Sequence, residues 1–280
     1  MDIQTIASIE QISNLRGNHI IGNFDFVNSK VTFKGNDNVL ISSNLETPEK
    51  IRLINTEITF NNDNSVVFLS PSDKGYSIGL AIHNNCFCYI GANNYFNGKL
   101  NLQCSEQCNI FIADDCLFSF GVWLRTSDVH LIYDLNSHRR INCSKSIFIG
   151  EHVWVGQDAR IWKGTHIGSG AILGASSFSA GKRIPSNTAW GGNPARLIKK
   201  GVFFLGNSSH LFTDEETEKW SQCLNDKYIY TFDKNETLDF FELEQKVKSF
   251  ITARDRAEFL LNFSRSKSKN RFYIADNDDL

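Results

Sequence analysis

The chain has 280 residues, 41% of them hydrophobic, and a formal net charge of −2 at pH 7. This length suits one or two folded domains, and the nearly balanced charge argues against a general polyanion-binding protein, so we expect no nucleic-acid partner. Because the sequence has no run of about 18 apolar residues, we expect no transmembrane segment. The start MDIQTIASIE also lacks the basic and apolar parts of a signal peptide, which predicts a cytoplasmic protein.

Residues 1–120 alternate short strand-like runs with turn signals. Runs such as KVTFKG, TEITFN and NIFIAD alternate apolar and polar residues, and Asn, Asp and Gly separate them. Two sets of apolar residues recur every six positions: Ile21, Val27, Phe33 and Val39, and then Ile112, Phe118 and Leu124. We expect this half to consist of irregular coils of a solenoid, with these residues facing its interior.

Residues 147–177 carry the same period without interruption. The repeated positions are Ile149, Val155, Ile161, Ile167 and Leu173, with Ser179 at the next one. A helix repeats its apolar face about every 3.6 residues and a strand about every 2, so neither alone explains a period of six. Short flat strands joined by turns explain it, because stacked coils bury the same position of each hexad. The sequence therefore predicts a β-solenoid.

From Thr213 onward the pattern becomes helical. The segment TDEE (213–216) has the form of a capping box, and LDFFELEQKVKSFI (238–251) and RDRAEFLLNF (254–263) have helical spacing. Residues 264–280 have the composition of a mobile or partner-bound tail. We expect a helical extension after the solenoid.

The cysteine pattern gives no sign of a metal site. The cysteines are Cys86, Cys88, Cys104, Cys108, Cys116, Cys143 and Cys223. The first four have no histidine or second CxxC at the spacing of a zinc site. Free thiols packed in the interior are the usual outcome in a reducing compartment, so we expect no metal.

Three motifs, taken together and in order, resemble one enzyme family. They are RTSDVHLIYD (125–134), IFIGEHVWVGQDARIWKGTHIGSGAILGASS (147–177) and IPSNTAWGGNPARLIKK (184–200). The chain is thereby similar to the hexapeptide-repeat acetyltransferases, and most similar to the bacterial O-acetyltransferases that modify capsular and other surface polysaccharides. The resemblance implies a mainly β protein built on a left-handed parallel β-helix, a homotrimer, and acetyl-CoA bound in the groove between adjacent subunits.

On this interpretation the chain divides into three parts. Residues 1–120 form irregular N-terminal coils of the β-helix. Residues 121–205 form the regular hexapeptide-repeat core, with an active-site loop at 124–146, and residues 206–280 form a helical C-terminal extension and tail. A location peripheral to the inner membrane, with a polysaccharide assembly complex, is the alternative to a freely cytoplasmic one.

His130 is the candidate general base, because it occupies the family's SDxH position in SDVHLIYD. Transfer of an acetyl group to a sugar hydroxyl needs a base that removes the hydroxyl proton, and an imidazole suits this near neutral pH. Asp128 or Asp134 would accept a hydrogen bond from one ring nitrogen and set the tautomer, and the choice between them is open. Tyr133 and His138 are candidates for contacts with the acceptor sugar.

The donor site is predicted from the regular coils and the segment that follows them. Trp154 would point outward, because Val153 and Val155 point inward, and in the family this tryptophan lies near the reaction centre, CoA and the acceptor. The candidate CoA-binding residues are Trp154, Gly156, Gln157, Gly174, Ala175, Ser176, Lys182, Pro194, Arg196 and Lys199. Coil corners would offer backbone groups to pantetheine, and the cations would bind phosphates. Trp190 would either stack on adenine or cover the solenoid end.

The predicted function is direct transfer of acetyl from acetyl-CoA to a sugar hydroxyl of a bacterial capsular or other surface polysaccharide, in a ternary complex. An N-acetyltransferase acting on an amino sugar nucleotide would use the same donor site and base. A γ-type carbonic anhydrase is an alternative outside the acyltransferases, but His130, His152 and His166 do not share a hexad position, as convergent zinc ligands would. A purely structural solenoid would need neither SDVH nor GGNPAR.

The acceptor is the least defined part of this prediction. Phe- and Asn-rich segments in residues 1–120 favour an extended carbohydrate surface and hence a large substrate. The same phenylalanines would equally fill a wide solenoid interior. Polymer and small-sugar acceptors therefore both stay open at this point.

Overall fold

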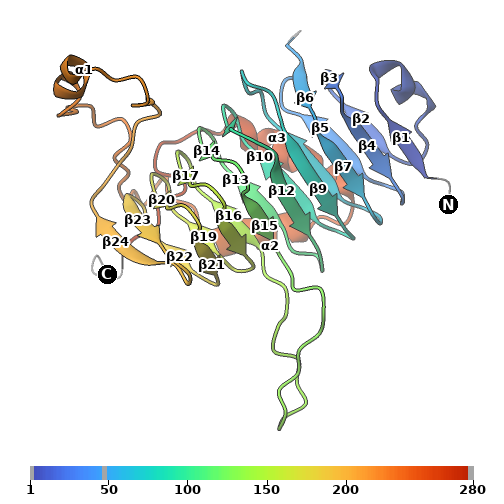
Figure 1. Cartoon of the computed structure of the whole chain (residues 1–280). Coiled ribbons are helices and arrows are strands. Elements are labelled where there is room, and N and C mark those ends of the chain that lie inside the picture. Colours follow the sequence, from blue (N-terminus) through green and yellow to red (C-terminus); the bar gives the residue numbers. More distant parts are fainter. Residues whose placement is uncertain (1–2, 46–48, 277–280) are drawn as a thin grey trace.

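The structure is a computed structural model that describes residues 3–45 and 49–276. Its strands wind into a three-sided, left-handed parallel β-helix, which runs from the N-terminal coils to β24 (Figure 1). Each strand pairs with the strands of the coils on either side of it, so three long sheets form the three faces. The prediction of a mainly β solenoid is confirmed.

The three faces are named here by the order in which the chain reaches them. Face 1 consists of β1 (Gln4–Ile6), β4 (Lys30–Phe33), β7 (Glu57–Phe60), β9 (Ile78–Ile82), β12 (Leu100–Cys104), β15 (Trp123–Arg125), β18 (Arg160–Trp162) and β21 (Phe178–Ala180). Face 2 consists of β2 (His19–Ile21), β5 (Val39–Ser42), β8 (Val66–Leu69), β10 (Phe87–Ile90), β13 (Ile110–Ile112), β16 (Ile147–Ile149), β19 (His166–Ile167) and β22 (Arg183–Ile184). Face 3 consists of β11 (Tyr95–Phe96), β14 (Leu117–Phe118), β17 (Trp154–Val155), β20 (Ile172–Leu173), β23 (Thr188–Gly191) and β24 (Arg196–Lys200). In the first coils, β3 (Phe24–Val27) and β6 (Ile51–Ile54) pair on the third side.

The N-terminal coils are wider than the regular ones. Along face 1 the register advances by 27 residues from Lys30 to Glu57 and by 22 from Gly79 to Asn101. It advances by only 18, from Arg160 to Phe178, in the regular coils. The hexad positions predicted for the first coils are therefore partly wrong. The side chain of Val27 is 40% exposed and Val39 packs under the C-terminal helices, because the extra residues shift which side chains point inward.

One hydrophobic core fills the solenoid along its whole length. The aliphatic residues of the regular repeat are all buried in it, as predicted: Ile149, Val155, Ile161, Ile167 and Leu173. Ser179 takes the next interior position, and its hydroxyl oxygen lies 3.3 Å from that of Thr165. Stacked aromatic rings fill the wider coils, as in the pair Phe33 and Phe60, whose centroids are 4.8 Å apart. Large rings thus occupy the extra width that the longer coils create.

Both ends of the solenoid are covered by the chain itself. At the N-terminal end β1 runs antiparallel to β4, and the 3₁₀ helix η1 (Ile9–Asn14) places Ile12 against the core. At the other end β24 runs antiparallel to β23. There Trp190 packs against the core and donates from Nε1 to Thr188 Oγ1 (3.0 Å), so it covers the solenoid end.

The C-terminal extension contains α1 (Asp214–Lys219), α2 (Phe240–Lys248) and α3 (Ala253–Arg265). Thr213 and Glu216 form the predicted capping box of α1. Helices α2 and α3 lie behind the solenoid in Figure 1, where they pack with the apolar outward side chains of face 2 in a second core. Within residues 3–45 and 49–276, none of the helices is both long enough and apolar enough to cross a membrane.

The prediction of a mobile or partner-bound tail is wrong for its described part, residues 264–276. Phe272 and Ile274 are buried in the second core, and Arg271 is only 2% exposed. Arg271 Nε donates to Glu151 Oε1 (2.8 Å), and the backbone nitrogen of Ser186 donates to Ile274 O (2.9 Å). The segment is mostly polar, and its few apolar residues were therefore not predicted to pack on the apolar surface of face 2. The rest of that prediction, for 277–280, lies outside the described residues.

Candidate active site

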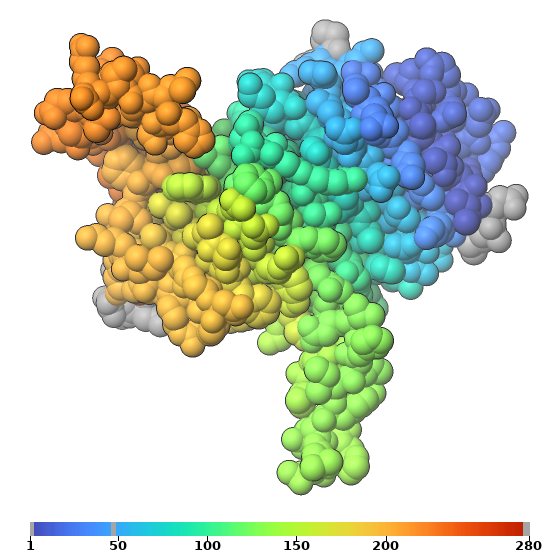
Figure 2. All heavy atoms as spheres, in the orientation of Figure 1, coloured from blue at the N-terminus to red at the C-terminus, as the bar shows by residue number. Residues whose placement is uncertain are grey.

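A long hairpin loop carries the predicted catalytic residues. Residues 126–146 leave the solenoid between β15 and β16, at the corner between faces 1 and 2, and project away from the body of the protein (Figures 1 and 2). The Lys145 nitrogen donates to Thr126 O (3.1 Å) at the base, and further out the Ile141 nitrogen donates to Ile132 O (2.9 Å). The loop is therefore an ordered ladder of backbone hydrogen bonds.

A charged cluster at the base ties the hairpin to the next coil. Lys163 Nζ lies 2.5 Å from Asp128 Oδ2 and also donates to Asn142 O (2.8 Å). Asn142 Nδ2 donates to Asp128 Oδ2 (3.1 Å) and to His130 O (2.7 Å). The hydrogen bond from the Lys163 ammonium lowers the pKa of the Asp128 carboxyl group. Because this cluster holds both strands of the hairpin, it sets the direction in which the hairpin leaves the coil.

A second ion pair braces the hairpin against an earlier coil. The Arg140 guanidinium binds the Glu106 carboxylate through two hydrogen bonds, of 2.5 Å and 2.9 Å, and Ser144 donates to the same carboxylate. The hydrogen bond from Arg140 is the main reason that the pKa of Glu106 falls to about 2. The hairpin is thus held from both neighbouring coils.

His130 lies in the outward strand of this hairpin with its side chain exposed to solvent. Both carboxylates considered as its orienting group are hydrogen-bonded elsewhere in this chain. Asp128 binds Lys163 and Asn142, and Asp134 accepts from the backbone nitrogen (2.8 Å) and the hydroxyl (2.8 Å) of Ser137. Those bonds lower the pKa of Asp134 and stabilise the turn at the hairpin tip. The role of Asp128 or Asp134 in orienting the imidazole stays a prediction.

The two candidates for acceptor contacts lie near the tip of the hairpin. Tyr133 forms an antiparallel bridge with Arg140, and its ring is exposed. His138 has φ 54° in the tip turn, where its backbone nitrogen donates to Asp134 O (3.0 Å). Their side chains are available to a second molecule.

Trp154 lies on face 3 with 43% of its side chain exposed, and the neighbouring Val153 and Val155 are buried. Its outward orientation is therefore confirmed. The ring of Phe204, from the segment that follows β24, packs beside it with centroids 5.8 Å apart. The indole thus has one covered edge and one open face.

Five of the predicted donor-site residues form a continuous ladder at the corner between faces 3 and 1. Gly156 N donates to Leu173 O (2.7 Å), and Ser176 N donates to Gln157 O (2.7 Å). A Cβ atom at Gly156 would lie 2.5 Å from the nitrogen of Ala175, so the two corners can stack only with glycine there. The ladder starts beside Trp154 and continues toward the C-terminal end of the solenoid through these residues: Gly156, Gln157, Gly174, Ala175 and Ser176.

The predicted phosphate-binding residues are divided between two places. Pro194 and Arg196 are exposed at the start of the antiparallel end strand β24, and Lys199 lies further along that strand. Lys182 instead lies between β21 and β22, at the corner of faces 1 and 2 from which the hairpin also leaves. Lys182 and the Trp154 ladder therefore lie at different corners of one chain.

No protein-family model matches the chain, but individual known proteins are similar to it. The polysialic acid O-acetyltransferase of Escherichia coli O1:K1 / APEC is 34% identical over 113 residues, which are 40% of this chain and 36% of that relative. The polysialic acid O-acetyltransferase of Neisseria meningitidis is 28% identical over 137 residues, 49% of this chain and 60% of that relative. The chain thus spans only 36% and 60% of the lengths of these two relatives.

A solved structure extends the similarity over most of the fold. The polySia-specific acetyltransferase NeuO superposes with a TM-score of 0.58 and 30% identity, over 73% of this chain and 93% of NeuO. The chain belongs to the bacterial capsule O-acetyltransferase family. The resemblance inferred from the three motifs is confirmed, and with it the hexapeptide-repeat fold of an acyltransferase.

The other histidines considered in the sequence lie elsewhere in this acetyltransferase. His152 is buried between the rings of Phe204 and Tyr228, whose centroids are 4.1 Å and 3.5 Å from its own, and burial lowers its pKa. His166 points from face 2 toward Phe240, and burial lowers its pKa as well. His130, His152 and His166 therefore occupy three separate parts of one chain.

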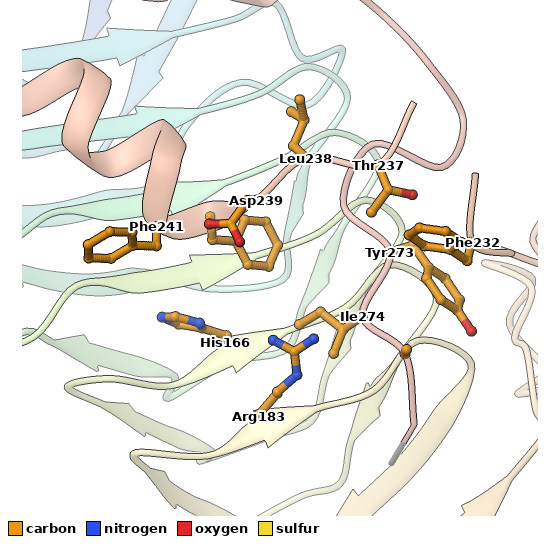
Figure 3. Close-up of a pocket in the computed structure, with 11 residues that line it drawn as sticks. His166, Arg183, Phe232, Thr237, Leu238, Asp239, Phe241, Tyr273 and Ile274 are labelled. Carbon is orange, nitrogen blue, oxygen red and sulfur yellow. The ribbon is translucent and has the colours of Figure 1, made fainter. Parts of the chain in front are cut away.

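Sequence reasoning did not predict a pocket on face 2 of the acetyltransferase. His166 and Arg183 form its floor, and Asp239, Phe241 and the segment 273–275 surround it (Figure 3). Its volume is about 550 Å³. The pocket exists because the C-terminal extension leaves a gap over the last coils, and it lies on a different face from Trp154.

The residues that position the hairpin were also missed. Lys163, Asn142, Glu106 and Arg140 are spread over distant parts of the sequence. Lys163 stands in the hexapeptide repeat, which assigns it no role, and the other three stand in no recognisable motif. The only sequence signal is the pair of charges Asp128 and Lys163, and a pairing across so many residues becomes visible only when coils are stacked.

Proposed function

We propose that the protein transfers the acetyl group of acetyl-CoA to a hydroxyl group of a capsular polysaccharide, with His130 as general base. The observation that carries this proposal is the similarity to NeuO over 93% of that structure, together with a histidine held in an ordered, exposed hairpin. The same geometry offers Trp154 and a ladder of coil corners as the donor site.

The direct transfer needs one general base and no acyl-enzyme intermediate. The Nε2 or Nδ1 atom of His130 takes the proton of the sugar hydroxyl while the hydroxyl oxygen attacks the thioester carbonyl carbon. The tetrahedral intermediate collapses with cleavage of the carbon–sulfur bond, and the imidazolium returns its proton to the CoA thiolate. An imidazole can perform both transfers because its ordinary pKa is near neutral pH.

The donor would lie along the corner ladder that begins at Trp154. Extended pantetheine needs backbone donors and acceptors without side-chain obstruction, which Gly174 and Ala175 provide at an exposed corner. Arg196 and Lys199 lie beyond them on β24 and would bind the phosphates, whose charge a guanidinium matches well. A location in the cytoplasm, where acetyl-CoA is made, is part of the same proposal.

We further propose a homotrimer in which each active site is shared. In one chain the hairpin of His130 and the indole of Trp154 leave from different parts of the solenoid, and the hairpin projects away from its own body (Figure 1). The hairpin also exposes a row of apolar side chains: Val129, Leu131, Ile132, Tyr133, Leu135 and Ile141. A second copy that covers these residues would bring its own Trp154 toward His130, and Lys182 would reach the donor from the hairpin's side.

An acyl-transfer assay tests the proposed activity. Radiolabelled acetyl-CoA is offered with polysialic acid, other capsular polymers, free sugars and amino sugar nucleotides. We expect label in a polysaccharide, in an alkali-labile ester. Label in an alkali-stable amide of an amino sugar nucleotide would instead assign N-acetylation, and transfer to none of these acceptors would refute the proposal.

Mixed trimers test the shared site. A His130→Ala chain and a Trp154→Ala chain are coexpressed with different tags, and trimers that carry both tags are isolated. One site in each such trimer, about a third of all the sites, would then combine an intact hairpin with an intact Trp154 face, so activity should return well above that of either variant alone. Coexpression of chains that carry both substitutions is the control. An active monomer in sedimentation, or mixed trimers without regained activity, would contradict a shared site.

A further inference from the structure

A groove lies on face 3, on the N-terminal side of Trp154. The outward side chain of Tyr95 on β11 is in register with Leu117 on β14, which is in register with Trp154 on β17. Neighbouring strands are about 4.8 Å apart, so Tyr95 lies roughly 10 Å from Trp154 along one face. The groove therefore leads away from the proposed reaction centre, in the direction opposite to the donor ladder.

The walls of this groove come from distant parts of the chain. The turn at 72–74 forms one side, residues 93–97 form the floor with Leu117, and the segment 206–210 returns from the end of the solenoid to form the other side. In Figure 2 the orange segment stands off from the teal and green coils, with a recess between them. The cavity has a volume of about 620 Å³, within the range of roughly 300–1,000 Å³ that is typical of ligand sites.

The side chains in the groove are those that bind carbohydrate. The ring of Tyr95 is 38% exposed, and a flat aromatic ring can stack against the apolar face of a sugar. Asn93 and Asn97 are exposed on either side of it, and an amide both donates to and accepts from sugar hydroxyls. Lys74, exposed at the rim beside Asp73, supplies a cation for the carboxylate of an acidic sugar.

We propose that this groove binds the acceptor polymer at sugar units next to the one that is acetylated. The inference rests on the proposed function and adds a location to it: the donor lies on the C-terminal side of Trp154, and the polymer lies on the N-terminal side. It also assigns a role to the wide N-terminal coils, whose turns at 72–74 and 93–97 build the groove. The polymer we propose is an acidic polysaccharide, because the Lys74 ammonium at the rim would pair with the carboxylate of an acidic sugar.

Substitution of Tyr95 tests this assignment by kinetics on polysialic acid of high chain length. Tyr95→Ala should raise the KM for the polymer about tenfold and leave kcat and the KM for acetyl-CoA unchanged, since about 1.4 kcal/mol of stacking corresponds to a factor of ten. Tyr95→Phe keeps the ring and should behave as the unchanged protein. Phe241→Ala, which removes an exposed ring of α2 that lies over face 2, is the control (Figure 3). An unchanged polymer KM in Tyr95→Ala would overturn the inference.

A binding measurement without acetyl-CoA separates this inference from the proposed activity. The Kd of polysialic acid should be about tenfold weaker for Tyr95→Ala than for Phe241→Ala, whether or not acetyl transfer is observed. If the protein transfers acetyl to no carbohydrate but shows this difference, the proposed activity fails and the groove stands. Equal Kd values for the two variants, or no binding of the polymer to the unchanged protein, would overturn the groove assignment.

Discussion

Two segments leave the β-helix of this acetyltransferase, and they treat their apolar residues in opposite ways. The C-terminal extension from α2 onward folds back on face 2 and buries Phe240, Val247 and Phe272 in a core of its own. The hairpin at 126–146 projects away, and its Leu135 side chain is 86% exposed. The two segments are nevertheless both ordered, the first by packing and the second by backbone hydrogen bonds and ion pairs.

This difference in exposure reflects the surface against which each segment packs. Face 2 presents stacked outward rings, such as Phe68, Tyr89 and Phe111, that need a cover, and the extension supplies it within the chain. No part of the described chain lies over the tip of the hairpin. An apolar side chain stabilises only where it leaves water, so the packed helices of the extension stabilise the fold, and the exposed side chains of the hairpin are the surface that the proposed trimer would cover.

The largest effect on the hairpin side is expected from His130→Ala. Loss of a positioned general base should lower kcat by about 10²–10⁴-fold, because the sugar hydroxyl must then lose its proton to water. Because the side chain is exposed, the unfolding temperature and the affinity for CoA should stay the same. Stopped-flow or steady-state assays with calorimetry of CoA binding measure both. Nearly normal kcat would remove His130 from the mechanism.

The corresponding effect on the extension side is expected from Phe272→Ala. Its ring is fully buried against Phe240, Phe111 and Phe263, so truncation should lower the free energy of unfolding by about 3–5 kcal/mol. Leu135→Ala, at the exposed hairpin tip, is the control and should change stability by less than about 0.5 kcal/mol. Chemical denaturation of both variants decides the comparison. Equal losses of unfolding free energy in the two variants would mean that the extension and the hairpin do not differ in how they contribute to stability.

The free energy of unfolding should also depend on pH, through the contact between the extension and face 2. Burial is the main cause that raises the pKa of Glu151 to about 7 from 4.5, although Arg271 pairs with it. The folded state then holds this proton more tightly than the unfolded chain, so the stability from this group is complete below pH 4.5 and is lost as pH rises toward 7. The loss should be about 1–3 kcal/mol.

Glu151→Gln isolates this contribution. The amide does not titrate, so the slope of unfolding free energy against pH between about 4.5 and 7 should become less negative than in the unchanged protein. Denaturation at several pH values measures the slope, whatever the absolute stability of the variant. An identical slope in both proteins would contradict the raised pKa.

The smallest effect is expected at the base of the hairpin. Lys163→Ala removes the cation that binds both Asp128 and the carbonyl oxygen of Asn142, so the hairpin should lose its fixed direction. We expect kcat to fall about tenfold through poorer placement of His130, with little change in the unfolding temperature. Lys163→Arg, which keeps the charge, should recover part of the activity. A variant with full kcat would show that the backbone ladder alone orients the hairpin.

Much of the fold could be predicted from the sequence alone, because it depends on local sequence patterns. A period of six with glycine at the corners admits only stacked flat strands, so the interior positions from Ile149 to Leu173 follow directly from the spacing. Helices α2 and α3 likewise follow from their own periodicity. The proposal of His130 as the base depends on one short motif, which needs no knowledge of the fold.

Other features were decided only by the tertiary structure. Val27 and Val39 continue the six-residue count, but longer turns between them rotate the register, and turn length is not visible as a period. Arg271 and Phe272 lie in a polar segment whose few apolar residues gain meaning only against face 2. The separation of Trp154, on face 3, from His130 and Lys182, which share the corner between faces 1 and 2, is of the same kind. The corner at which a residue lies depends on the lengths of all the strands and turns that precede it. No single stretch of sequence determines it.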